Sequence, residues 1–174
     1  ETRAPGGWGK YCGIATRQAF ALEDDRPVVV ELELTPLVMG VDSQIICSAT
    51  ETGEVAYRCS FNGSTNRFGI YTQSAVRLDE KWVSPEPGWK PRASSPTVTI
   101  NTTYRLRAEI RRRAWRITLW ERGQKPLQPP LWDTGAVPMD GLAQTRLIFA
   151  DVEPENSTGA SRWGPITIWQ QKHR

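Results

Sequence analysis

Histidine is almost missing from this sequence. Of the 174 residues one is a histidine, His173, and it is the last residue but one. Hydrolysis by a Ser–His–Asp or Cys–His arrangement needs an imidazole held in a folded site between a nucleophile and an orienting group. A histidine at this position does not meet that need, so these two kinds of catalytic site are excluded.

Cysteine is also scarce. The chain has three cysteines, Cys12, Cys47 and Cys59, so one of them stays unpaired within it. They do not form a disulfide framework, and their spacing is not that of a zinc site. We predict that Cys47 and Cys59 lie nearly opposite each other across a hairpin as buried free thiols, because cysteine packs as a small hydrophobe. A cross-strand disulfide is the alternative.

Long apolar runs are absent as well. No stretch of ~18 apolar residues occurs and the first residues lack a signal-peptide core, so we predict no membrane span. The net charge of +3 is too small to indicate a nucleic-acid partner. Because the sequence begins at Glu1 without a methionine, we expect residues 1–174 to be a single domain excised from a larger protein.

Three glycosylation sequons bear on localisation. They begin at Asn62, Asn101 and Asn156. Such motifs are acceptors in secreted proteins, whereas an unpaired cysteine is more typical of a cytosolic one. We expect a secreted or cell-surface protein, and whether the sequons carry sugar stays open.

Alternation of apolar and polar residues predicts strands along most of the chain. The stretch "RPVVVELELTP", residues 26–36, alternates between two faces and predicts a strand with one wet face. One face has Val28, Val30, Leu32 and Leu34, and the other, wet face has Val29, Glu31, Glu33 and Thr35. A hairpin is predicted around residues 51–54, and a further strand begins near Arg67. Seven or more strands at this spacing predict an all-β antiparallel β-sandwich, or jelly roll.

The basic stretch 104–120 predicts another hairpin, whose turn falls on three consecutive arginines. The alternation sets Leu106 opposite Leu119 on the core face. The same parity sets Arg105 opposite Trp120 on the solvent face.

Residues 82–97 contain four prolines and show no periodicity, which predicts a long exposed loop. This loop carries Trp82 and Trp89. A ring on a proline-stiffened loop is presented to a ligand at little entropic cost. The alternative is that both rings fold back onto the sandwich.

The order of these elements resembles a known superfamily. The stretch "TYRLRAEIRRRAWRITLWERGQKPLQPPLWDTG" is similar to the segment of concanavalin A-like and laminin-G-like sandwiches in which two paired strands precede a short edge strand. The later "TRLIFADVEPENSTGASRWGPITIW" is similar to their two closing strands. The resemblance covers about Arg26 to Trp169 and implies the fold rather than a particular activity.

Several functions occur on this fold: carbohydrate-binding modules, lectins, adhesion domains and family 16 glycoside hydrolases. The resemblance implies, for those hydrolases, a Glu-x-Asp-x-x-Glu motif on one strand. The present strand has Glu31 and Glu33 without a third carboxylate in register. An enzyme of that kind is therefore disfavoured, and we interpret the two glutamates as solvated side chains.

The eight tryptophans are the most informative composition feature, because a flat ring stacks on a sugar and also anchors protein partners. We expect Trp115, Trp163 and Trp169 to pack in or on the core. Trp120 lies on the wet face. The candidate ligand-binding residues are Trp82, Trp89, Trp120, Arg105, Arg107 and Arg116.

Arginines beside Trp120 would suit a sugar with an acidic substituent, since guanidinium groups bind carboxylate or sulfate. Glu109 is placed to pair with Arg116. The alternative is that Arg105 stacks on Trp120 as a solvated cation–π pair.

Scattered acidic residues raise the option of a structural calcium ion, which sandwiches of this type often hold. No spacing specifies such a site, and a solvated acidic rim is our expectation. The residues concerned are Asp24, Asp25, Asp133, Asp140, Asp151, Glu153 and Glu155.

Our leading hypothesis is a non-catalytic carbohydrate-binding module for a polysaccharide, with an acidic one as an option. A laminin-G-like domain that binds a protein partner is the second hypothesis. A glycan hydrolase or lyase with an unfamiliar site is the third.

Overall fold

The computed structural model describes residues 2–3, 11–37, 42–48, 55–62, 66–74, 76–78, 81–83, 90–124, 128–139, 141–152 and 160–170. In these ranges the regular elements are β-strands in antiparallel pairs, and no helix is long and apolar enough to cross a membrane. In chain order they are β1 (Thr2–Arg3), β2 (Tyr11–Ala15), β3 (Phe20–Ala21), β4 (Val28–Pro36), β5 (Asp42–Ser48), β6 (Val55–Asn62), β7 (Arg67–Ser74), β8 (Val76–Leu78), β9 (Lys81–Val83), β10 (Lys90–Ser94), β11 (Tyr104–Ile110), β12 (Ala114–Glu121), β13 (Trp132–Asp133), β14 (Val137–Pro138), β15 (Gln144–Val152) and β16 (Ala160–Gln170).

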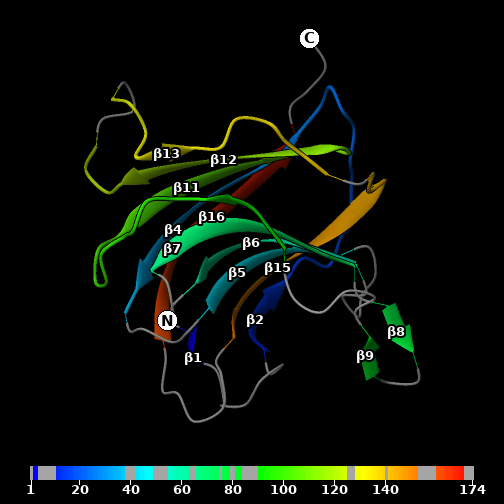
Figure 1. Ribbon diagram of the computed structural model, residues 1–174, viewed down its shortest axis with the longest axis horizontal. Helices are drawn as coiled ribbons and strands as arrows, with labels where there is room; N and C mark the ends of the chain where they lie inside the picture. Colours follow the sequence, from blue (N-terminus) through cyan, green and yellow to red (C-terminus); the bar gives the residue numbers. More distant parts are fainter. Residues whose placement is uncertain are drawn as a thin grey trace.

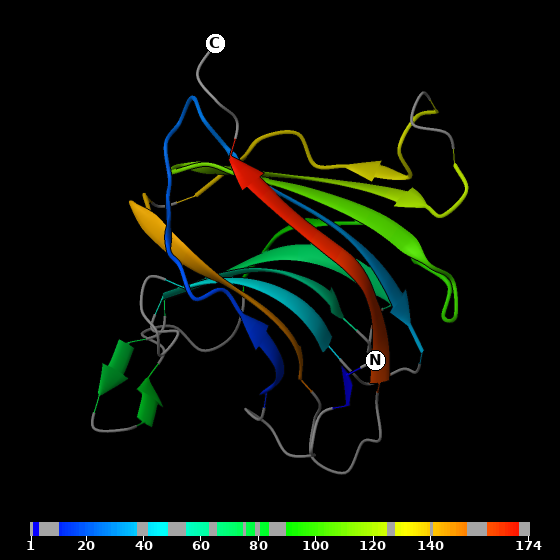
Figure 2. The same cartoon turned by 180° about the vertical axis from the view of Figure 1, so that it is seen from behind.

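Two sheets form the two layers of the molecule. Sheet A has the strand order β1-β16-β4-β11-β12-β13, and β14 also pairs with β12. Sheet B has the order β10-β7-β6-β5-β15-β2, and β3 also pairs with β15. Figure 1 and Figure 2 show the two sheets stacked face to face from opposite sides. This arrangement confirms the predicted antiparallel β-sandwich.

The core lies between the sheets and follows from the alternation along each strand. Phe61 and Phe68 of sheet B have ring centroids 5.5 Å apart, and Phe68 meets Tyr104 of sheet A at 6.0 Å. Trp115 is 1% exposed, which confirms its predicted place in the core. Truncating a buried aromatic ring of this size to alanine costs about 3–5 kcal/mol.

The predicted register of the basic hairpin is confirmed. Leu106 lies opposite Leu119 and Arg105 lies opposite Trp120. The inward leucines are buried, while the side chains between them reach the outer face of sheet A. Because β11 also pairs with β4, the hairpin brings its arginines beside the glutamates of that strand.

Strand β4 is wet over only part of its predicted solvent face. Glu31 and Glu33 are half-buried, whereas Val29 on the same face is buried. The reason is that β4 is a central strand. Val29 is flanked by Trp169 of β16 on one side and by Glu109 of β11 on the other.

Cys47 and Cys59 are free and buried, as predicted. Burial raises the pKa of each thiol to about 12, since the thiolate would lose its hydration. They are not opposite each other, however. Cys59 pairs with Ile45 and Cys47 pairs with Tyr57, so the two cysteines are offset diagonally by two positions.

The prediction of one long exposed loop over residues 82–97 is wrong. Strand β9 extends into its start and pairs with β8, and β10 lies within it and joins the edge of sheet B. Pro91 does not prevent this, because an edge strand and the adjoining register shift tolerate a residue without an N–H donor.

Of the three sequon asparagines, Asn101 has a described side chain. It is exposed at a turn with a φ of 64°, a left-handed conformation that asparagine tolerates. The side chain of Asn62 and the whole of Asn156 lie outside the described residues.

Candidate functional site

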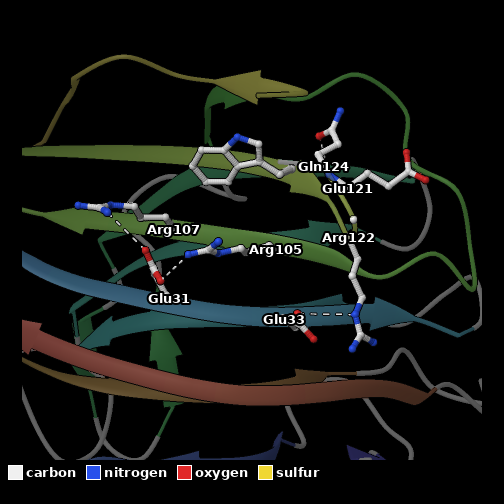
Figure 3. Close-up of a pocket in the computed structure, with 9 residues that line it drawn as sticks. Glu31, Glu33, Arg105, Arg107, Glu121, Arg122 and Gln124 are labelled. Carbon is white, nitrogen blue, oxygen red and sulfur yellow. Dashed lines mark hydrogen bonds and ion pairs between the residues drawn. The ribbon is translucent and has the colours of Figure 1, made fainter. Parts of the chain in front are cut away.

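A pocket of about 330 Å³ opens on the outer face of sheet A. Its walls come from β4, β11 and the end of β12, at the positions that alternate with core residues (Figure 3). We refer to it as the sheet A pocket. It is lined by Glu31, Glu33, Arg105, Arg107, Trp120, Glu121, Arg122, Gly123 and Gln124.

Glu31 organises one end of this pocket. Its carboxylate accepts a hydrogen bond from Arg105 Nη2 at 2.9 Å through Oε2, and one from Arg107 Nη1 at 3.3 Å through Oε1. Figure 3 shows the two guanidinium groups on either side of the carboxylate. Arg107 also meets Glu109 at 3.4 Å, so both of its acidic neighbours hold it against the sheet.

The other end is formed by the turn that follows β12. Gly123 has a φ of 96°, a conformation that a side chain would strain, and the turn closes with a 3.1 Å hydrogen bond from Gln124 N to Glu121 O. The turn aims Arg122 at β4, where its Nε lies 3.8 Å from Glu33 Oε1 (Figure 3).

The charges of the pocket are balanced. Its lining contains three arginines and three glutamates, which sum to zero. Each of the arginines is engaged by a carboxylate of β4. The pocket is therefore a surface whose charges cancel rather than a cationic one.

Trp120 supplies the aromatic surface of the pocket. It is half-buried, and its indole Nε1 is buried without a hydrogen-bond partner in the described part of the chain. Arg105 directs its guanidinium to Glu31. The cation–π pair between Arg105 and Trp120, the alternative considered from the sequence, is not among the aromatic contacts of the described residues, where Arg107 instead lies over Trp169.

Arg116 lies outside the lining of the pocket, and its place among the candidate ligand-binding residues stays a prediction. It donates to Asp133 of β13 through Nε at 3.0 Å and through Nη2 at 2.7 Å. The hydrogen bond from Arg116 lowers the pKa of Asp133, and Asp133 in turn raises the pKa of Arg116. Glu109, the expected partner, lies opposite Arg116 but makes its ion pairs with Arg107 and Arg111.

Four other tryptophans considered from the sequence divide into three groups. Trp163 packs edge-on against Phe149 at 6.2 Å and donates to Asp151 at 3.1 Å, which confirms a packing role. Trp169 is half-buried on the outer face of sheet A, 5.8 Å below the guanidinium of Arg107. Trp89 and the side chain of Trp82 lie outside the described residues.

The acidic residues that the structure describes do not gather into a calcium site. Among the described residues there is no group of three or more histidine, cysteine, aspartate or glutamate side chains arranged to hold a metal ion. Asp24 instead accepts from Arg113 N, Asp133 pairs with Arg116, and Asp151 accepts from Trp163. Asp140, Glu153 and Glu155 lie outside the described residues.

Sequence reasoning named three lining residues, Arg105, Arg107 and Trp120, and missed the rest. Glu31 and Glu33 were recognised as outward-facing but interpreted as solvated side chains. Their role depends on the β4–β11 pairing, which joins residues 74 positions apart. Arg122 carried no periodic signal, because it lies in a turn.

Comparison with known proteins identifies the fold. No protein-family model and no curated protein matches the sequence. The carbohydrate binding module CBM66 from Bacillus subtilis superposes with a TM-score of 0.60 at 12% identity, covering 95% of this chain and 92% of that one. A legume lectin-like domain from Entamoeba histolytica gives 0.58 at 10% identity, covering 97% and 82%.

An enzyme shares the same architecture. A family 16 glycosyl hydrolase from Mycobacterium smegmatis gives a TM-score of 0.54 at 13% identity, covering 96% of this chain and 73% of that one. This chain thus has a concanavalin A-like β-sandwich fold, as the resemblance in the sequence implied. Sequence identities this low show the fold but not the ligand, which depends on the residues of the site.

Proposed function

We propose that this chain is a non-catalytic carbohydrate-binding module that holds a polysaccharide in the sheet A pocket through Trp120, Arg105 and Arg107. The observation that carries the proposal is the pocket lining, where an indole ring adjoins charged side chains that are already paired. The fold that the chain shares with a carbohydrate binding module and a lectin-like domain supports the same class of ligand.

The chemistry of a sugar matches this lining. A pyranose has an apolar face, which stacks on a tryptophan ring, and an edge of hydroxyl groups. Each hydroxyl both donates and accepts a hydrogen bond. Arg105 Nη2 lies 2.9 Å from a carboxylate oxygen of Glu31. A sugar hydroxyl beside this pair would therefore find a donor in Arg105 and an acceptor in Glu31.

The balanced charge favours a neutral polysaccharide over an acidic one. A carboxylate or sulfate substituent would have to displace Glu31 from Arg105 and Arg107, which it holds at 2.9 and 3.3 Å. A neutral hydroxyl adds to these ion pairs without breaking them. The acidic ligand considered from the sequence is therefore our second choice.

Affinity gel electrophoresis against neutral and acidic polysaccharides tests the proposal. We expect retardation by a neutral polysaccharide, and Trp120→Ala should weaken it by about tenfold, the effect of losing one aromatic contact. Arg113→Ala is the control, because that side chain is 70% exposed and lies outside the pocket. Equal losses of retardation in the two variants would show that the sheet A pocket is not the binding site. A wild type that binds no glycan would favour a protein partner instead.

Glu31→Gln separates the neutral ligand from the acidic one. The variant keeps the side-chain shape but frees Arg105 and Arg107 from a negative charge. We expect weaker retardation by the neutral polysaccharide and stronger retardation by an acidic one, measured on the same gels. A wild type that prefers the acidic polysaccharide would overturn the neutral assignment.

A hydrolase is the second candidate, because Glu31 and Glu33 both line the pocket from alternate positions of one strand. Glycosidases use two carboxylates on either side of the scissile bond. Here each of the two is engaged by arginine, which fits a binding role better. Release of reducing ends by the wild type, lost in both Glu31→Gln and Glu33→Gln, would establish the hydrolase instead.

Trp82 and Trp89 stay predictions from the sequence. The same gels test them, since each single alanine variant should weaken retardation if its ring contacts sugar.

A further inference from the structure

Trp169 lies on the same face of sheet A as the pocket. Strand β16 pairs with β4, so that Thr167 stands opposite Glu31 and Trp169 stands opposite Val29. Register partners point to the same side of a sheet. Ile166 and Ile168, which alternate with Thr167 and Trp169 along β16, pack against the core on the other side. The indole of Trp169 therefore faces outward, beyond the end of the pocket that Glu31 forms.

Arg107 connects this indole to the pocket. Its guanidinium lines the pocket, lies 3.3 Å from Glu31, and at the same time sits 5.8 Å from the centre of the Trp169 ring. Figure 3 shows the group directed away from Arg105, toward the start of β4. Arg107 thus contacts both Glu31 in the pocket and the ring of Trp169.

The two tryptophans stand at opposite corners of this surface. Trp120 is level with Arg105 and Trp169 is level with Glu109, four positions apart along β11. They are also separated by three strand spacings, from β12 across β11 and β4 to β16. Standard strand dimensions then place their Cα atoms roughly 20 Å apart. A single sugar ring does not bridge that distance, whereas a short oligosaccharide chain does.

We propose that Trp169 is a second aromatic subsite, and that the ligand is an oligosaccharide chain lying diagonally across sheet A from Trp120 to Trp169. This inference rests on the proposed function and specifies its ligand as the interior of a neutral polysaccharide rather than a monosaccharide or a chain end. Arg105, Glu31 and Arg107 contact the hydroxyl groups between the two rings. Arg107 additionally fixes the position of the Trp169 indole.

The features that support a chain-binding surface are its length and its partial exposure. The side chains of Arg105, Glu31 and Arg107 are 46%, 24% and 31% exposed, so each offers hydrogen-bonding groups to solvent while its ion pairs fix its direction. Thr167, beside Glu31, is exposed and has a hydroxyl of its own. A rigid polar strip between two half-exposed rings is suited to repeated hydroxyl groups along a chain.

Isothermal titration calorimetry with size series of neutral oligosaccharides tests the inference. The probes are cello-, laminari-, xylo- and manno-oligosaccharides, each from disaccharide to hexasaccharide. For the series that binds, we expect the wild-type affinity to rise with chain length. Trp169→Ala should leave the disaccharide unchanged and weaken the hexasaccharide by about tenfold. Trp120→Ala should weaken both.

Trp169→Phe is the matched variant, because it keeps an aromatic face and should retain most of the hexasaccharide affinity. Its melting temperature, and that of Trp169→Ala, show that the variants are folded. Equal hexasaccharide affinity in wild type and Trp169→Ala, with Trp120→Ala still defective, would overturn the second subsite and leave the proposed function standing. A wild type that binds none of the probes would overturn both.

Discussion

Gly164 is a position at which both the fold and the pocket depend on a missing side chain. It lies in β16 at a register shift between Trp163, opposite Leu34, and Ile166, opposite Leu32. A Cβ at this glycine would come 2.8 Å from the Cβ of Glu33, a pocket residue on the neighbouring strand. We therefore predict that Gly164→Ala destabilises the protein and displaces Glu33.

The size of the destabilisation by Gly164→Ala depends on whether the neighbouring atoms are able to move away from the new Cβ. The atom in the way is a Cβ, fixed to the backbone of β4, so a side-chain rotation does not relieve the contact. Forcing an extra methyl group into a packed position costs about 1–3 kcal/mol. Replacing glycine restricts the unfolded chain and returns roughly 0.4–1 kcal/mol. The net loss in the free energy of unfolding is then about 0–2.6 kcal/mol.

Urea unfolding at neutral pH measures this change, provided that the slope against denaturant is the same in both proteins. Gly141→Ala is the matched control, because nothing lies within 4 Å of its added Cβ. We expect the control to be as stable as the wild type or slightly more stable. If Gly164→Ala matches the control, the close approach of β16 to Glu33 is wrong. A displaced Glu33 should also lower polysaccharide retardation.

Two further predictions concern ionisable groups. In a Cys12→Ser variant, neither Cys47 nor Cys59 should react with Ellman's reagent at pH 8 until the protein is unfolded, because burial raises the pKa of each thiol from 9.0 to about 12. For the same reason stability should fall as the pH rises through that interval, since the unfolded thiols ionise first. The ion pair of Arg116 with Asp133 should contribute less than ~1 kcal/mol, because it is largely exposed. Its contribution should disappear in acid, because the pKa of Asp133 is lowered below 3.8 in the folded protein and the stabilisation is lost as the pH falls through that lowered value.

Rapid reaction of either thiol in the folded Cys12→Ser variant would contradict the buried placement. For the ion pair, the measurement is the difference in unfolding free energy between wild type and Asp133→Asn across the acid range. A difference that does not change with pH would show that Asp133 acts through packing and not through its charge.

Local patterns in the sequence were sufficient for several of the longer strands and for the β11–β12 hairpin. A tight turn joins β11 to β12, so parity alone set Arg105 opposite Trp120, as the structure confirms. The same reasoning gave the wrong partner for Arg116. Its true partner, Asp133, belongs to an edge strand of two residues, which is too short to produce a periodic signal.

The site itself was predicted only in part, for a physical reason. Strands β4 and β11 are far apart in the sequence, and their pairing depends on how both sheets pack. The residues next to either strand therefore do not predict this pairing. Glu31 therefore looked like a solvated charge, although it joins two arginines of another strand. Edge-strand tolerance for proline likewise depends on the sheet order, which is why β10 was interpreted as a loop.

The double engagement of Glu31 has a consequence for the thermodynamics of ligand binding. An unrestrained arginine carries about 2 kcal/mol of rotamer entropy, which a ligand would have to overcome in ordering it. Arg105 and Arg107 are already restrained by the shared carboxylate before any ligand arrives. Association with a neutral chain should then lose little side-chain entropy. Because the pocket charges cancel, its affinity should also vary little with ionic strength.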